Sequence, residues 1–179
     1  SRAMPSSGSA EMSLAALDTP VATVDLDAVE RNVARMQGYC DAHGLAFRPH
    51  IKTHKLPALA HLQVSAGAVG IACQKLGEAE VMQQAGIDDI LVGYPIVGST
   101  KLDRLGDLAE RARIRVSIDS VAVARGLSDL ARERGLELEV LIELDTGLRR
   151  LGVLPGAPAV ELAQRIAELT GGHLVQILV

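Results

Sequence analysis

Short apolar segments rich in β-branched residues alternate with longer amphipathic segments along most of this chain. The apolar segments cover residues 21–25, 45–51, 68–73, 89–93, 113–118, 138–144 and 173–179. Helical patterns between them cover about 28–43, 56–66, 76–86, 99–112, 120–135 and 158–170. Strands that alternate with helices of this length predict βαβ units and a parallel sheet. The chain is therefore predicted to be an α/β protein.

The arrangement of these units favours a barrel over an open doubly wound sheet. No G-x-G-x-x-G sequence follows the first apolar segment, which disfavours a dinucleotide-binding Rossmann site. The regular spacing fits a TIM-like (β/α)8 barrel instead. From residue 45 onward we find about six of the eight strands that such a barrel needs, so we expect an incomplete barrel. We expect it to span residues 14–179, after a tag or disordered leader at residues 1–13.

Composition restricts the partners of the chain. With 22 acidic and 18 basic residues the net charge is −4, which argues against nucleic acid or an anionic membrane as the main partner. Cys40 and Cys73 are too few for a disulfide framework, which fits a reducing compartment. Neither a signal-peptide pattern nor an apolar run long enough to span a membrane is present. We therefore expect a cytoplasmic protein with a small-molecule substrate.

Residues that cap helices support the predicted helix ends. Asp27 and Glu30 have the spacing of a capping box for the first helix. Ser120 or Asp119 is expected as an N-cap, and Gly135 as the end of the helix that follows.

Polar or conformationally special residues follow five successive predicted strands. They lie at residues 50–54, 73–75, 93–95, 119–120 and 145–150. In parallel barrels the catalytic groups lie where strands end and the next loops begin. Helix N-caps also belong at these points, so the pattern is only moderately specific.

The segment RPHIKTHK, residues 48–55, places five basic side chains within eight residues of this slightly acidic chain. If residues 46–52 are extended, Arg48, His50 and Lys52 share one face of a strand. Lys52 is then predicted to point into the barrel mouth, with His50 and Arg48 beneath it. Cationic neighbours and partial desolvation would favour the neutral amine that forms a Schiff base.

Two other interpretations of RPHIKTHK remain open. The segment could be an exposed turn. Alternatively, His50 and His54 could bind a metal as an i,i+4 pair, but that pairing needs a helix, and Pro49 with the β-prone run before it disfavours one. We therefore predict no metal ligands in this chain.

Four motifs give the chain a family resemblance that covers residues from about 17 to 169. They are TPVATVDLDAVERN (19–32), RPHIKTHK (48–55), GAVGIACQKLGEAEVM (67–82) and LDTGLRRLGVLPG (144–156). These motifs resemble the fold type III pyridoxal-phosphate enzymes of the alanine racemase barrel type. Within that group, RPHIKTHK and CQKLGEAE resemble the branch of D-threonine aldolase and the metal-dependent D-serine dehydratases.

The resemblance implies specific roles for four residues. Lys52 matches the lysine that forms a Schiff base with pyridoxal 5'-phosphate. Arg150 matches the arginine that hydrogen-bonds the phenolic oxygen of the cofactor ring. His50 and Gln74 are implied as neighbours of the cofactor.

Three further residues of the motifs receive plainer interpretations. Lys55 is expected at a helix start or as a surface charge. Arg149 is expected to be structural or exposed, and Cys73 to be a small buried residue.

The resemblance also implies an activity and parts that this chain lacks. The implied function is a pyridoxal-phosphate lyase that acts on β-hydroxy D-amino acids and cleaves Cα–Cβ, as D-threonine aldolase does. A D-serine dehydratase, an amino-acid racemase and a non-catalytic carrier of the cofactor stay open as alternatives. The later barrel strands, a C-terminal β-domain and the ligands of a divalent metal are expected outside this chain, and homodimer formation is implied as well.

Overall fold

A computed structural model describes residues 16–170 and 174–178, and they form a five-stranded parallel sheet with helices between the strands. The strands are β1 (Ile71–Cys73), β2 (Asp89–Val92), β3 (Arg113–Ile118), β4 (Leu138–Ile142) and β5 (Leu174–Leu178). The helices are α1 (Leu26–Ala42), the 3-10 turn η2 (Ile51–Thr53), α2 (Pro57–Ser65), α3 (Leu76–Gln84), α4 (Ser99–Ala109), α5 (Val121–Arg134) and α6 (Ala157–Thr170). The leader predicted at residues 1–13 lies outside the described residues.

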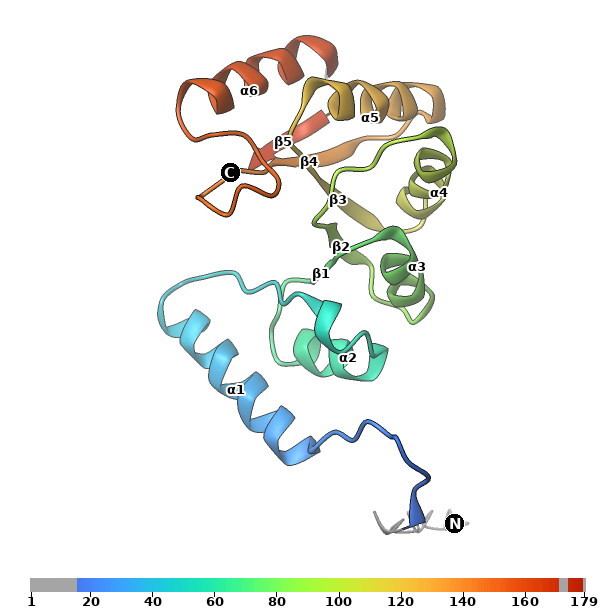
Figure 1. Ribbon diagram of the computed structural model, residues 1–179, viewed down its shortest axis with the longest axis vertical. Helices are drawn as coiled ribbons and strands as arrows, with labels where there is room; N and C mark the ends of the chain where they lie inside the picture. Colours follow the sequence, from blue (N-terminus) through green and yellow to red (C-terminus); the bar gives the residue numbers. More distant parts are fainter. Residues whose placement is uncertain (1–15, 171–173, 179) are drawn as a thin grey trace, which may run out of the picture.

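The sheet order confirms the predicted partial barrel. The strands lie side by side in chain order, β1-β2-β3-β4-β5, and each pair is parallel. Figure 1 shows helices α3, α4, α5 and α6 following one another along one side of the sheet, with α1 and α2 at its β1 end. This is the arrangement of successive βα units in an arc of a (β/α)8 barrel.

The apolar core lies between the sheet and these helices. Alternate residues of β3, Ile114, Val116 and Ile118, are almost fully buried, and Ile114 pairs in register with Ile90 of β2. On the helices, the buried partners in the same core include Leu105, Leu108, Leu127, Leu130, Leu162 and Ile166. Burial of each such side chain contributes about 1.5–3 kcal/mol. These buried side chains lie on the face of the sheet that the helices cover.

Two predicted strands are absent. Residues 45–49 have no regular secondary structure, and the run forms only a single bridge, His50 to Ala72, on the side of β1 away from β2. Pro49 has no N–H to donate, so a regular ladder cannot continue through it, although its carbonyl accepts the N–H of Ala72 at 2.8 Å. Residues 21–25 also form no strand. Val21 and Val24 are exposed, and helix α1 begins directly after Asp25.

The predicted helix ends are confirmed for α5 and wrong for α1. Ser120 accepts the N–H of Val123 at 3.4 Å, and Gly135 ends α5 in the left-handed conformation. Helix α1 begins earlier than predicted, so its N-cap is Asp25, which accepts the N–H of Ala28 at 2.9 Å. The proposed capping box of Asp27 and Glu30 therefore lies inside the helix.

The cysteines behave as the sequence predicts. Cys40 and Cys73 are both free and buried. Burial, with the nearby Glu78 charge, raises the pKa of Cys73 to about 12, so this thiol stays protonated. None of the helices in the described residues is both long enough and apolar enough to cross a membrane.

Candidate active site

Lys52 lies on a short turn beside the carboxyl end of β1. The turn η2 is anchored by Ile51, which is fully buried, while Lys52 and Thr53 are exposed. The carbonyl of Ile51 accepts the N–H groups of His54 at 3.1 Å and Lys55 at 2.8 Å. The prediction that Lys52 continues a strand is therefore wrong, because the chain turns at His50. Its placement at the carboxyl end of the sheet is as predicted.

The structure also separates the basic residues that the sequence clusters. Arg48 extends to the amino end of the sheet, where it donates to the carbonyls of Ile71 and Asp89 and pairs with the Asp89 carboxylate at 2.7 Å. Arg48 therefore does not lie beneath Lys52 as a tuning cation. Within the described part of the chain, no ion pair engages the Lys52 amine.

His50 contacts both Lys52 and Gln74. Its Nδ1 accepts the backbone N–H of Lys52 at 3.3 Å, and Gln74 lies close enough to its side chain to influence its pKa. The pKa of His50 is lowered, mainly by burial and secondarily by the Lys52 charge, while Gln74 and Glu78 oppose the shift. A neutral imidazole is consistent with Nδ1 as an acceptor. Three of the four predicted site residues, Lys52, His50 and Gln74, are thus brought together.

Glu78, in the first turn of α3, joins this group although the sequence did not single it out. Its side chain is 6% exposed; one carboxylate oxygen accepts the N–H of Gln74 at 2.8 Å and the other lies 3.2 Å from Nζ of Lys55. Lys55 is half-exposed, as a surface charge would be, but it adopts a left-handed conformation with φ 55° and has this buried partner. The signal that could have revealed Glu78 is its position four residues after Gln74 within CQKLGEAE.

Arg150 lies on a folded loop after β4. Asp145 accepts the N–H groups of Gly147 and Arg149, both at 2.9 Å, and these bonds lower the pKa of Asp145. A bridge between Leu144 and Val153 closes the loop, and Arg150 itself is exposed. Arg149 is also exposed, as predicted.

Arg150 and the Lys52 turn share one end of the sheet but are not in contact. Strands β1, β2 and β3 lie between the His50 bridge and β4. Four strand spacings would separate them by about 19 Å on a flat sheet, and barrel curvature shortens that span. The structure therefore places Arg150 on the predicted rim while separating it from the cluster of His50, Lys52 and Gln74.

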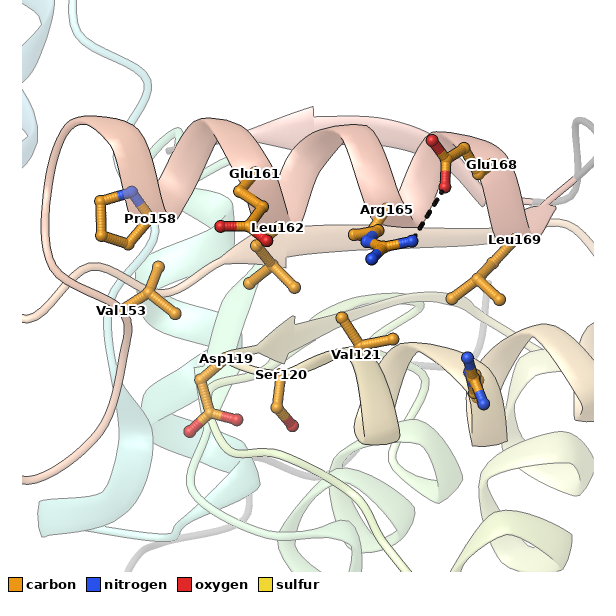
Figure 2. Close-up of a pocket in the computed structure, with 11 residues that line it drawn as sticks. Asp119, Ser120, Val121, Val153, Pro158, Glu161, Leu162, Arg165, Glu168 and Leu169 are labelled. Atoms are coloured by element: carbon orange, nitrogen blue, oxygen red, sulfur yellow. Dashed lines mark ion pairs between the residues drawn. The ribbon is translucent and has the colours of Figure 1, made fainter.

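Among the pockets formed by the described residues, two have volumes of about 510 Å³, and Gln74 of this site lines one of them. It lies at the carboxyl ends of β1 and β2, where Gln74, Lys75 and Tyr94 contribute to its wall. Figure 2 shows the other, which lies between α5 and α6: Val121 and Leu162 border the gap, and Arg165 pairs with Glu168 at 3.6 Å. The second pocket contains none of the four predicted residues, so we assign the candidate site to the β1 end.

The histidines of RPHIKTHK do not form a metal-binding pair. His50 precedes the 3-10 turn and His54 follows it, and each Nδ1 accepts a backbone N–H two residues later. In residues 16–170 and 174–178, no three His, Cys, Asp or Glu side chains gather as a metal site would require.

Comparison with known proteins gives consistent matches. The family model described as alanine racemase, N-terminal domain, matches residues 24–179. D-threonine aldolase of Arthrobacter sp. is 41% identical over 158 residues, which are 88% of this chain and 42% of that protein. D-threo-3-hydroxyaspartate dehydratase of Delftia sp. (strain HT23) is 41% identical over 140 residues, 78% of this chain and 37% of that protein.

Solved structures agree with these relatives. D-threonine aldolase from Filomicrobium marinum superposes with a TM-score of 0.87 and 44% identity, over 92% of this chain and 44% of that one. The Delftia dehydratase gives a TM-score of 0.79 at 40% identity, over 88% of this chain and 41% of that one. This chain thus spans about two fifths of the length of these relatives.

Proposed function

Because this chain belongs to the alanine racemase N-terminal domain family, we propose that it is the cofactor-binding barrel portion of a pyridoxal-phosphate lyase. The proposed substrates are β-hydroxy D-amino acids, and the proposed reaction is the Cα–Cβ cleavage of a D-threonine aldolase, which gives glycine and an aldehyde. The observation that carries the proposal is the Lys52 amine, exposed at the carboxyl end of the sheet beside His50 and Gln74.

The residues at this end of the sheet fit an aldehyde cofactor. Covalent attachment needs a primary amine that solvent and cofactor can reach, and Lys52 is exposed with no ion-pair partner among the described residues. Burial lowers the pKa of the neighbouring His50, so at neutral pH its imidazole keeps Nδ1 free to accept the Lys52 backbone N–H. Lys52 would hold the cofactor, and Arg150 would bind the phenolic oxygen of its ring. When bound, pyridoxal phosphate supplies an electron sink for negative charge at the substrate Cα.

The chain's own residues would orient Lys52 in this reaction. The His50 side chain accepts the Lys52 backbone N–H at 3.3 Å, so it restricts the position of the turn. The Asp145 carboxylate, which accepts the N–H groups of Gly147 and Arg149, shapes the β4 loop that carries Arg150 at the same end of the sheet. The divalent metal that the family resemblance implies would take its ligands from residues outside this chain.

A dehydratase is the second candidate. The Delftia dehydratase is as similar in sequence as the aldolase of Arthrobacter, at 41% identity. The higher TM-score of the Filomicrobium aldolase, 0.87 against 0.79, favours the aldolase. Alanine racemase of Clostridium difficile, at 22% identity, supports the fold alone.

Covalent trapping tests the proposed attachment site. The full-length protein is mixed with pyridoxal phosphate, reduced with borohydride, digested and analysed by mass spectrometry. We expect the pyridoxyl group on the peptide that contains Lys52, and its loss in Lys52→Ala. Labelling at another lysine with Lys52 unmodified would refute the assignment.

Product analysis tests the proposed reaction. Incubation of the full-length protein with D-threonine should release glycine and acetaldehyde rather than 2-oxobutanoate. Release of 2-oxobutanoate would favour the dehydratase, and the absence of both products would refute the proposed D-threonine cleavage.

A further inference from the structure

Lys52 lies on a turn that no regular strand supports. Only three residues form η2, and the turn ends at Lys55, whose left-handed conformation is unfavourable for a residue with a side chain. Such a conformation persists where surrounding contacts hold it. The contacts that hold Lys55 therefore determine how firmly Lys52 is placed.

The Glu78 carboxylate supplies the principal contact. It is buried, and both of its oxygens are used: one accepts the N–H of Gln74 at 2.8 Å and the other pairs with Lys55 Nζ at 3.2 Å. A buried carboxylate is stable only with such partners. Its position in the first turn of α3 adds the favourable field of a helix N-terminus. One side chain thus joins α3, the end of β1 and the end of the Lys52 turn.

These contacts hold the turn on both sides of Lys52. Lys55 follows Lys52 by one turn, Glu78 joins Lys55 to the backbone N–H of Gln74, and Gln74 lies beside the His50 side chain. His50 then accepts the backbone N–H of Lys52. The geometry points to Glu78 and Lys55 as positioning residues, whose ion pair holds the Lys52 turn against the end of β1. The inference rests on the proposed function, in which Lys52 carries the cofactor.

Variants of Lys55 separate its charge from its backbone conformation. Lys55→Ala removes the ion pair and keeps the strained backbone, Lys55→Gly removes the pair and tolerates the left-handed conformation, and Lys55→Arg keeps the cation. Glu78→Gln removes the negative charge of the same ion pair. Glu80→Gln is the matched control, because Glu80 lies on the same helix and pairs with Arg104 at 2.6 Å, away from the Lys52 turn.

The first measurement is the rate at which pyridoxal phosphate modifies Lys52 in the full-length protein, followed by borohydride trapping and mass spectrometry. We expect Lys55→Ala, Lys55→Gly and Glu78→Gln to slow this modification by about tenfold, and Lys55→Arg and Glu80→Gln to stay within about twofold of wild type. A double variant, Glu78→Gln with Lys55→Ala, should be no slower than the slower single variant, because both changes remove the same interaction.

Wild-type rates in the Lys55→Ala and Lys55→Gly variants, which change a half-exposed residue, would overturn the inference even if Glu78→Gln fails to fold. Restoration by Lys55→Gly alone would also overturn it, since backbone conformation and not the ion pair would then be the cause.

The second measurement does not depend on the cofactor. Hydrogen exchange in the cofactor-free protein should be faster at the amides of residues 51–55 and 74 in Lys55→Ala, and unchanged in β3. If wild type does not attach the cofactor at Lys52, the proposed function fails while this exchange still tests the ion pair. Unchanged exchange at residues 51–55 in Lys55→Ala would refute the positioning role.

Discussion

The two ends of the sheet use charge in opposite ways. At the amino end, Asp89 pairs with both Arg48 and Arg115, and Glu139 pairs with Arg115 at 2.6 Å and Arg113 at 2.5 Å. At the carboxyl end, the Lys52 amine has no ion pair within the described residues. Arg48 and Lys52 are only four residues apart in RPHIKTHK, yet Arg48 lies at the amino end of the sheet and Lys52 at the carboxyl end. The charges at the amino end thus pair with one another and stabilise the fold, whereas the carboxyl end has, besides the Lys55–Glu78 pair, a lysine amine that is available for chemistry.

The difference follows from where the network lies. Asp89 and Arg113 are the first residues of their strands, and Arg115 pairs in register with Glu139. Arg115 is 8% exposed, so its charge depends on these carboxylates. In parallel barrels, residues at this end contribute to stability and those at the carboxyl end to function.

The largest expected effect is the loss of Lys52. Lys52→Ala should lower lyase turnover by at least about 10³-fold, because the only proposed attachment point for the cofactor is removed. The free energy of unfolding without cofactor should change by less than about 0.5 kcal/mol, since the side chain is exposed. Steady-state kinetics and urea unfolding measure the two quantities. A large loss of stability would show that the carboxyl end, too, is structural.

The opposite pattern is expected for Arg115. Arg115→Met should destabilise the protein by about 3 kcal/mol, because Asp89 and Glu139 lose their most buried cation. The rate of pyridoxal phosphate attachment should not change in the protein that remains folded. Arg132→Met is the control, since Arg132 is exposed and its ion-pair partner among the described residues is the exposed Asp129, and it should cost less than about 0.5 kcal/mol. An Arg115→Met protein as stable as this control would contradict the structural role of the network.

Gly70 tests how closely the amino-end network is packed. A side chain at Gly70 would collide with Arg48 Nη1 and the Asp89 carbonyl, and its φ of 145° disfavours residues other than glycine. Gly70→Ala is expected to destabilise the protein by about 2 kcal/mol. Gly38→Ala is the control in helix α1, where an added Cβ meets nothing within 4 Å, and it should stabilise slightly. Thermal unfolding of both variants measures the contrast, and equal melting temperatures would refute the packing argument.

The sequence predicts the sheet better than it predicts the site. Strands β1 to β4 follow from apolar runs whose alternate residues, such as Ile114 and Val116, are buried under helices. The run at residues 45–51 looks similar but forms no strand, because Pro49 interrupts the ladder at the sheet edge. The hydrophobic pattern of a segment cannot show on which of its two edges a neighbouring strand is present to pair with it.

The site depends on contacts that sequence spacing cannot show. The position of Lys52 at the carboxyl end was predicted because residues 50–54 follow a predicted strand. Its direction into the barrel mouth was predicted from strand parity, which does not apply to a 3-10 turn. The pairing of Lys55 with Glu78 requires a left-handed lysine and the approach of α3, and neither leaves a periodic signal. The neutral state of His50 likewise depends on burial, which appears only once the chain is folded.

The smallest expected effect is the pH dependence contributed by His50. Its pKa in the folded protein is lowered from 6.5, mainly by burial, so the unfolded chain binds this proton more readily. Stability should therefore fall as the pH drops below about 6.5 and should level off below the folded-state pKa. Protonation would also remove the Nδ1 acceptor from the Lys52 N–H and so loosen the turn. In His50→Gln the slope of unfolding free energy against pH should be smaller over this range. In wild type, the protection of the residue 52 amide against hydrogen exchange, relative to its intrinsic rate, should decrease as the pH falls, and in His50→Gln this decrease should be absent. An unchanged slope in the variant would place the titrating group elsewhere and leave His50 without a part in holding Lys52.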